Sequence, residues 1–168
     1  MEIITPPAPQ PQYAGFWLRF GGLIIDSIVI SFAQSILFFS MLGTMGLKAI
    51  MEMQNQDMED LSDEDKMMLF AGMLGTLVTF IMAACVVQWL YFAIMESSSK
   101  QGTLGKMAVG IKVTDQAGNR ISFLRATGRH FGKIISGMIL CVGYLMAAFT
   151  EKKQALHDLM AGCLVVKK

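Results

Sequence analysis

The stretch that decides the fold of this chain covers residues 13–41 and reads YAGFWLRFGGLIIDSIVISFAQSILFFSM. A helix of about 20 apolar residues crosses the hydrocarbon core of a bilayer, so this stretch is long enough to span. It nevertheless contains Arg19 and Asp26. Counted from Phe16, Asp26 lies roughly 15 Å into the helix, close to the bilayer midplane. Because a charge at that depth is costly, we expect Asp26 to face protein and to belong to a functional site.

The polar and small residues of this first span share helix faces. Helical spacing places Arg19, Asp26 and Gln34 on one side. Small residues at every fourth position form a neighbouring stripe, which lets another helix approach closely: Ser27, Ser31 and Ser35. We expect Gln34, Ser27 and Ser31 to offer neutral oxygens near Asp26.

The composition is that of a membrane protein. Of the 168 residues 54% are hydrophobic and 16% are charged, which is enough chain for one domain. The net charge of +1 argues against a nucleic-acid partner. The three cysteines lack a zinc-binding spacing, and no metal or cofactor is expected. Residues 1–12 are predicted to be a disordered proline-rich tail, and residues 13–168 a single membrane domain.

A second span is predicted at residues 67–95. Its small-residue side suits docking on the serine stripe: Gly72, Gly75, Thr76, Thr79 and Ala83. Gln88 is expected to be buried and to hydrogen-bond across the bundle. The connection at residues 42–66 is acidic and poor in lysine and arginine, which places it outside the cell. Its acids lack the spacing of a calcium loop, and its methionines favour packing over copper binding.

The character of the chain changes at Glu96, after which basic residues dominate as far as Lys133. The positive-inside rule therefore places residues 96–130, and with them the N-terminus, in the cytoplasm. Residues 107–113 predict a strand, residues 115–119 a turn and residues 120–123 a return strand. Ser122 is predicted to cap a basic helix that lies along the membrane surface.

Residues 131–149 form a third apolar run, barely long enough to cross and interrupted by glycines and Lys133. A full crossing would put the lysines of the C-terminus outside, against the charge rule. We therefore expect a re-entrant or interfacial helix and a cytoplasmic C-terminus, with residues 164–166 paired to the strand at residues 111–113. The predicted fold is an all-α integral membrane protein with two transmembrane helices, this third apolar helix and a small cytoplasmic β element.

Three motifs occur in order along the chain: YAGFWLR at residues 13–19 followed by Asp26, SKQGTLGK at residues 99–106 running to GIKV at 110–113, and ALHDLMAG at residues 155–162. Together they resemble the RDD family of membrane proteins, named for one arginine and two aspartates. The resemblance makes Asp158 the second aspartate. It implies a small helical membrane domain in a mostly bacterial, largely uncharacterised family that is often proposed to take part in transport, with sodium/proton exchange suggested for some members. The acidic methionine-rich loop is not part of that pattern.

The geometry of the first helix limits how these three residues pair. Arg19 and Asp26 are roughly 10.5 Å apart along one face, too far for a good direct bond. We therefore expect Arg19, near the cytoplasmic interface, to pair with Asp158 and hold the closing motif against the first helix. Asp26, left without a countercharge, would favour its neutral form and could bind and release a proton or a cation. His157 is either a proton relay or, the alternative we favour, a polar turn residue.

The first functional hypothesis is a multi-pass protein of the inner membrane that transports a cation or proton, using Asp26, as a homo-oligomer. The oligomer would form through the Ser27/Ser31/Ser35 and Gly72/Thr76/Thr79 faces. The alternative is a non-transporting adaptor whose basic cytoplasmic face binds anionic lipid or a partner protein. An enzyme is not expected, because the sequence offers no nucleophile with a base, no metal cluster and no phosphate loop.

Overall fold

The computed structural model describes residues 11–53, 62–139 and 142–168. The proline-rich tail to residue 10, residues 54–61 of the acidic loop and Cys141 lie outside the described residues. The predictions for the tail and for the centre of that loop therefore stay predictions. Among the described residues, no group of three or more His, Cys, Asp and Glu side chains is placed to hold a metal ion.

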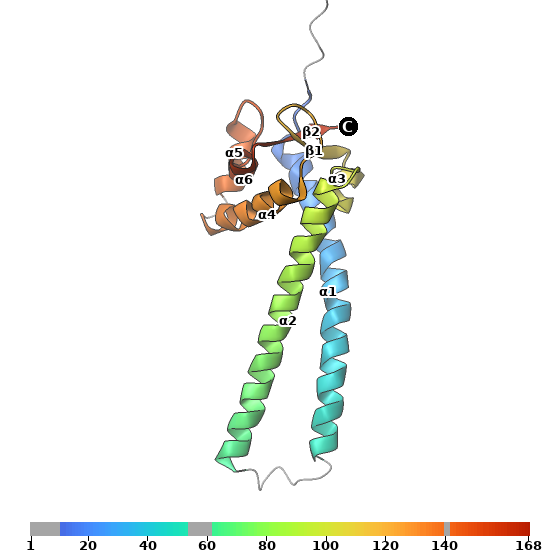
Figure 1. Cartoon of the computed structure of the whole chain (residues 1–168), viewed down its shortest axis with the longest axis vertical. Coiled ribbons are helices and arrows are strands. Elements are labelled where there is room, and N and C mark those ends of the chain that lie inside the picture. Colours follow the sequence, from blue (N-terminus) through green and yellow to red (C-terminus); the bar gives the residue numbers. More distant parts are fainter. Residues whose placement is uncertain (1–10, 54–61, 140–141) are drawn as a thin grey trace, which may run out of the picture. The chain divides into compact units, whose positions relative to one another are not determined.

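The described chain is mainly helical, and two of its helices are long and apolar enough to cross a membrane. They are α1 (Phe16–Met53), which contains the candidate span Phe16–Thr44, and α2 (Asp63–Ser97). The other elements, in chain order, are α3 (Leu104–Ala108), β1 (Ile111–Asp115), α4 (Phe123–Met138), α5 (Val142–Phe149), α6 (Leu156–Ala161) and β2 (Cys163–Lys167) (Figure 1). The predicted fold class, two transmembrane helices with a further apolar helical segment and a small β element, is confirmed.

The chain divides into two compact units. The first, which we call the motif unit because it contains all three sequence motifs, comprises Met1–Asp26 and Tyr91–Lys168. The second, the helix unit, comprises Ser27–Leu90. Helices α1 and α2 each contribute to both units.

The sheet of the motif unit contains the predicted pairing of residues 111–113 with 164–166. The strand predicted at residues 107–113 begins only at Ile111, because Leu104–Ala108 forms α3. Strands β1 and β2 are antiparallel, with Val113 opposite Val165. The chain ahead of α1 joins the same sheet, because the Ala14 amide donates to the Val165 carbonyl at 2.8 Å. The entrance of α1 and the C-terminal strand therefore lie side by side, as the expectation of a tail on the same side as the first helix requires.

The predicted return strand at residues 120–123 is wrong. The turn after β1 forms as expected, with the Asp115 carboxylate accepting from the Asn119 amide at 2.7 Å. The second edge of β1 is already occupied, since the Val113 amide donates to the Gln101 carbonyl at 2.6 Å. The chain instead leaves the sheet, and Ser122 caps α4 as predicted by accepting from the Arg125 amide at 3.3 Å.

The third apolar run is divided between α4 and α5, whose axes differ by 103°. The two helices pack closely, because a Cβ at Gly143 would lie 2.8 Å from the Ser136 Cβ. The basic helix does not simply lie on a surface with its arginines in solvent. Its residues Ala126, Arg129, Gly132 and Ser136 are buried within the motif unit.

The helix unit consists of the remaining lengths of α1 and α2. Their rings meet where Phe38 and Phe80 lie 5.4 Å apart, edge to face. The expected close docking at the serine stripe is not formed. Within the described residues, a Cβ placed at Gly72 or Gly75 would meet no atom within 4 Å. Thr76 and Thr79 donate instead to carbonyls of their own helix.

Candidate functional site

The structure brings Arg19 and Asp158 together. The Nη1 atom of Arg19 donates to Oδ2 of Asp158, whose side chain is completely buried. The rest of the guanidinium is held by backbone carbonyls of Ala14, at 3.0 Å, and Lys153, at 2.5 Å. The ion pair predicted from the sequence is therefore present, and it connects the start of α1 to the start of α6.

Arg129 is the second partner of Asp158 and was not predicted. Its Nε donates to Oδ1 of Asp158 at 2.7 Å, while its Nη1 donates to Oε2 of Glu96 at 2.6 Å. Its side chain is only 2% exposed. A guanidinium can donate along several directions in one plane, which is what joining two carboxylates requires. Arg129 thus connects the end of α2 to α6 through α4.

Glu96 collects three cations at the end of α2. Besides Arg129, Oε1 of Glu96 accepts from Nζ of Lys106 and, at 3.3 Å, from Nζ of Lys133. Lys133 also lies 3.9 Å from the centroid of the Phe92 ring, which offers its electron-rich face. We call the six side chains Arg19, Glu96, Lys106, Arg129, Lys133 and Asp158 the buried charge network. Its four cations and two carboxylates leave two excess positive charges when all are ionised.

Asp26 lies apart from this network in a cradle of neutral donors. Its Oδ1 accepts from the Tyr91 hydroxyl at 2.8 Å and the Gly105 amide at 2.7 Å. Its Oδ2 accepts from the Thr103 hydroxyl at 2.5 Å. Asp26 is 1% exposed, so it faces protein as predicted. All three described partners are donors, so both oxygens of the Asp26 carboxyl group act as acceptors.

Helix α3 approaches α1 so closely at this cradle that only glycine fits at position 105. A Cβ there would lie 2.0 Å from the Gly22 carbonyl oxygen and 2.8 Å from Cγ of Asp26. Thr103 caps α3, and its side chain also accepts from the Lys106 amide. The central motif therefore supplies two donors to Asp26 and, one residue later, the lysine that reaches Glu96.

His157 is buried beside Asp158. Its Nε2 lies 3.5 Å from Oδ1 of Asp158, and its ring stacks at a tilt on Tyr144 with 5.1 Å between centroids. Burial and the nearby Arg129 charge lower the pKa of His157 to about 2, although Asp158 opposes this. The sequence interpretation of His157 as a turn residue is wrong in its element, because His157 lies in the first turn of α6, where it is buried.

Burial and neighbouring charges shift the pKa values of the network, and Lys106 and Asp158 show how. Burial lowers the pKa of Lys106 to about 7, and the Arg129 charge adds to this, while Glu96 favours the protonated form. For Asp158, burial acts to raise the pKa, but the guanidiniums of Arg129 and Arg19 outweigh it and hold the pKa well below its usual range. The lowered pKa of Asp158 favours its carboxylate form, and the lowered pKa of Lys106 favours release of its proton compared with a solvated lysine.

The supporting polar residues predicted for Asp26 lie in the helix unit. Ser27, Ser31 and Gln88 are exposed on their helices, so the expectation that Gln88 is buried is wrong. Gln34 is half-buried, and its Nε2 donates to the Ala84 carbonyl at a long 3.5 Å. The hydrogen bonds described for Asp26 come instead from Tyr91, Thr103 and Gly105.

The sequence contained a signal for the residues that were missed. Glu96 is an isolated acid at the end of an apolar span, followed by many bases, and Arg129 and Lys133 are four apart on an amphipathic helix. In the sequence, an acid in that position indicates the end of a span and does not identify its partners. The three cations around Glu96 lie 10 to 37 residues away from it in the sequence. Helical or strand periodicity relates only residues within one element, so it does not predict contacts at such separations.

Comparison with known proteins assigns the family. The model of the RDD family matches residues 13–162. The chain belongs to the RDD family. The chain is 37% identical over 155 residues to the uncharacterized protein YxaI of Bacillus subtilis (strain 168), covering 92% of this chain and 97% of that protein.

Two further RDD-type relatives from the same organism are more distant. The uncharacterized membrane protein YteJ is 28% identical over 160 residues, with 92% of this chain and 80% of YteJ covered. The uncharacterized protein YckC is 23% identical over 160 residues, with 90% of this chain and 83% of YckC covered. No solved structure matches this RDD chain. In this RDD protein, the arginine and the two aspartates occupy two different places, the Asp26 cradle and the buried charge network.

Proposed function

We propose that this RDD membrane protein moves a cation or a proton across the bilayer and exchanges a proton at Lys106. The observation that supports this is the sharing of one buried carboxylate, Glu96, by Lys106, Lys133 and Arg129. Excess positive charge in a buried site favours release of a proton, and among these cations a lysine can release one while an arginine cannot. A buried group that titrates near neutral pH is typical of ion-handling sites.

In this proposal Asp26 has a positioning role, which differs from the sequence hypothesis that Asp26 itself handles the ion. All three described partners of Asp26 are neutral donors, and together they hold both oxygens of its carboxyl group in place. Two of the donors, Thr103 and Gly105, lie at the start of α3, the helix that carries Lys106. Asp26 would therefore hold Lys106 within reach of Glu96.

The proposal includes a homo-oligomer in the inner membrane with the motif unit in the cytoplasm. A chain with two long apolar helices has few elements to enclose a pathway. The open face around Gly72 and Gly75 admits another helix, because small residues allow close backbone contact. The excess of lysine and arginine in the motif unit supports its cytoplasmic location.

The test is ion flux into sealed vesicles that contain the purified protein and a pH-sensitive dye. Under a sodium or proton gradient we expect flux that Lys106→Arg abolishes, because arginine keeps the charge and does not release the proton. Lys100→Arg, at an exposed side chain in the turn ahead of α3, is the matched control and should keep its flux. Thermal unfolding of each variant establishes that it is folded.

Two results would contradict the assignment. Flux that survives Lys106→Arg but is lost in folded Asp26→Asn would return the ion-handling role to Asp26. The absence of flux in the unsubstituted protein under every cation gradient would exclude transport.

A second candidate function is a non-transporting adaptor, and the exposed surface of the motif unit favours it. Many of its exposed charged side chains are basic: Lys100, Arg120, Arg125, Lys152, Lys153, Lys167 and Lys168. Such a surface attracts an acidic protein or an anionic leaflet. Binding of an acidic partner by a protein that conducts no ion, with loss of binding when these cations are replaced by glutamine, would support the adaptor.

A further inference from the structure

Helices α4 and α5 present an apolar surface that the motif unit does not cover. The side of α4 that carries Arg129, Gly132 and Ser136 is buried. Large apolar side chains of both helices are exposed: Leu124, Phe131, Ile134, Ile135, Met138, Val142, Leu145 and Phe149. Met138 is 79% and Phe149 is 87% exposed, at the end of each helix. A surface of this kind marks contact with a membrane or a protein.

The connections of the motif unit rule out a single crossing by this pair. With α1 and α2 as the two spans, α3 begins on the side where α1 entered. Strand β2, which follows α6, pairs with β1 and receives the Ala14 amide, so it ends on that same side. The segment between them must therefore cross an even number of times. The 103° bend and the tight contact of Gly143 on Ser136 suit two short helices lying at the interface better than two full spans.

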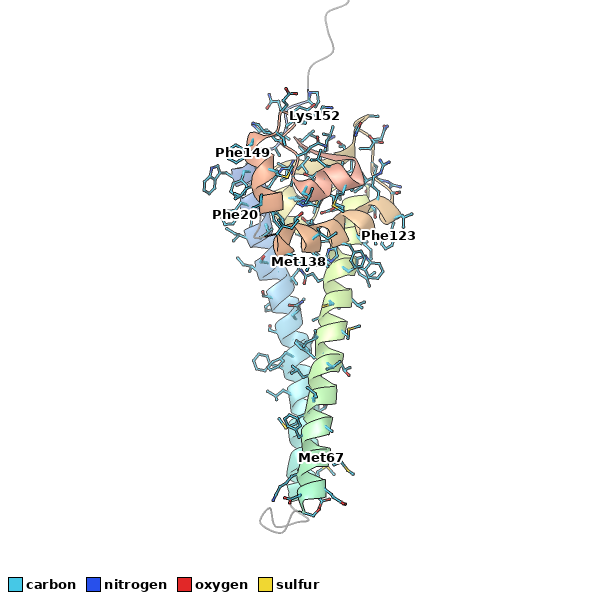
Figure 2. The ribbon with its side chains drawn as sticks, turned by 90° about the vertical axis from the view of Figure 1, so that its left-hand side faces the viewer. Phe20, Met67, Phe123, Met138, Phe149 and Lys152 are labelled. Atoms are coloured by element: carbon cyan, nitrogen blue, oxygen red, sulfur yellow. The ribbon has the colours of Figure 1, made fainter. Side chains whose placement is uncertain are left out.

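The surroundings of the apolar surface are those of a membrane interface. Exposed cations flank it in sequence, Arg120 and Arg125 around the start of α4 and Lys152 and Lys153 after the end of α5. In the view of Figure 2, Phe149 lies between Lys152 and Met138 on the motif unit, so a lysine lies beyond the apolar end of α5. The entrance of α1 adds Trp17, which is 77% exposed, and Phe20. Aromatic rings of this kind prefer the headgroup level.

We infer that the α4–α5 pair is an interfacial hairpin of the cytoplasmic leaflet, with its apolar side chains among the acyl chains and its flanking cations on anionic lipid phosphates. The ties of Arg129 and Lys133 to Glu96 hold α4 at the end of the α2 span, where the leaflet begins. The partner is a leaflet rich in anionic lipid, because the exposed charge next to the apolar surface is positive. The inference does not rest on either proposed function, since both are compatible with it.

Depth-dependent fluorescence quenching of the full chain tests the inference. The three cysteines are replaced by alanine, and a fluorophore is attached at Phe131→Cys, Met138→Cys, Phe149→Cys or, as the polar control, Lys152→Cys. The protein is reconstituted in phosphatidylcholine vesicles with or without phosphatidylglycerol, carrying nitroxides near the headgroup or deep in the acyl chain. We expect the three apolar sites to be quenched best by the shallow nitroxide, and the Lys152 site by an aqueous quencher.

Three outcomes would overturn the hairpin. Labels at Met138 or Phe149 that respond best to the deep nitroxide would indicate a re-entrant or crossing segment. Labels that respond to the aqueous quencher alone would show a surface outside the lipid. Labels shielded from both kinds of quencher would show that protein, such as a second copy of the chain, covers the surface.

The charge requirement is tested with matched triple variants. Shallow quenching at Phe149 should increase with the fraction of phosphatidylglycerol. The variant Arg120→Gln/Arg125→Gln/Lys152→Gln should lose that increase, because each cation removed should weaken the binding equilibrium with the anionic surface about fivefold. Lys112→Gln/Lys167→Gln/Lys168→Gln removes the same number of charges from the two strands and the residue after β2, and it should keep the increase. Equal behaviour of the two variants would overturn the role of the flanking cations.

Discussion

The two units of this molecule handle polarity in opposite ways. The motif unit buries the charged side chains of Asp26, Glu96, Lys106, Arg129 and Asp158, and each of them has a described partner. The helix unit leaves large apolar side chains such as Phe32, Phe39 and Met82 exposed along most of its length. The motif unit is therefore specified by ion pairs inside the protein, and the helix unit by the lipid that surrounds it.

This contrast predicts where substitutions matter. A buried charge that loses its partner has no water to replace it, so the motif unit should be sensitive to single changes. Side chains of the helix unit that face lipid should tolerate apolar exchange.

The largest effect is expected for Arg129→Met. It leaves Glu96 and Asp158 buried without the guanidinium that joins them, which should cost about 3–5 kcal/mol of unfolding free energy. Arg125→Gln, one turn earlier on the same helix and exposed, should change stability by less than about 0.5 kcal/mol. Thermal unfolding in detergent checks both, and equal stability of the two variants would show that the network is not needed for folding.

A smaller effect is expected for Gly105→Ala, which compares the units directly. The added methyl group would collide with the Gly22 carbonyl and displace α3 from Asp26, at about 3 kcal/mol. Gly43→Ala in the helix unit meets open space and should be neutral or stabilising by about 1 kcal/mol. If both glycines accept alanine alike, the close approach of α3 to α1 is not a feature of the protein in solution.

The smallest effect is a pH dependence that His157 gives the motif unit. Its pKa of about 2 lies below that of an unfolded histidine, so the unfolded chain binds the extra proton and stability falls as pH drops below about 6.5. Between pH 6.5 and 5 the loss should be about 2 kcal/mol. His157→Asn should flatten this part of the profile, and an unchanged slope would assign the dependence elsewhere. Asp158 lowers the stability further only below about pH 4, because the unfolded chain then binds a proton at this carboxylate while its lowered pKa keeps the folded form ionised.

The sequence was sufficient for the parts of the fold that follow from short-range patterns and from charge asymmetry. The two spans, the pairing of residues 111–113 with 164–166, the Ser122 cap and the pair of Arg19 with Asp158 were all predicted and are present. The membership in the RDD family was predicted from three motifs and is confirmed.

The network around Glu96 was not predictable in the same way, and the reason is physical. Lysine and arginine near a span are usually solvated, and on that basis the helix after Ser122, which contains Arg129, is predicted to lie along the membrane surface. The burial of Lys106 and Arg129 depends on how α3 and α4 pack, which only the tertiary structure reveals. The return strand predicted at residues 120–123 is wrong for the same reason. Gln101 occupies the free edge of β1, and only the tertiary structure reveals this contact.

The central claim is that Arg129 joins the carboxylates of Glu96 and Asp158 into one network, and a double-mutant cycle tests it most directly. Glu96→Gln and Asp158→Asn are measured singly and together by unfolding in detergent, in the presence of Arg129 and again with Arg129→Met. We predict that with Arg129 the double variant loses about 1–3 kcal/mol more than the sum of the single variants, because the guanidinium is then buried without a partner. With Arg129→Met this coupling should disappear. Additive losses in the presence of Arg129 would contradict the account.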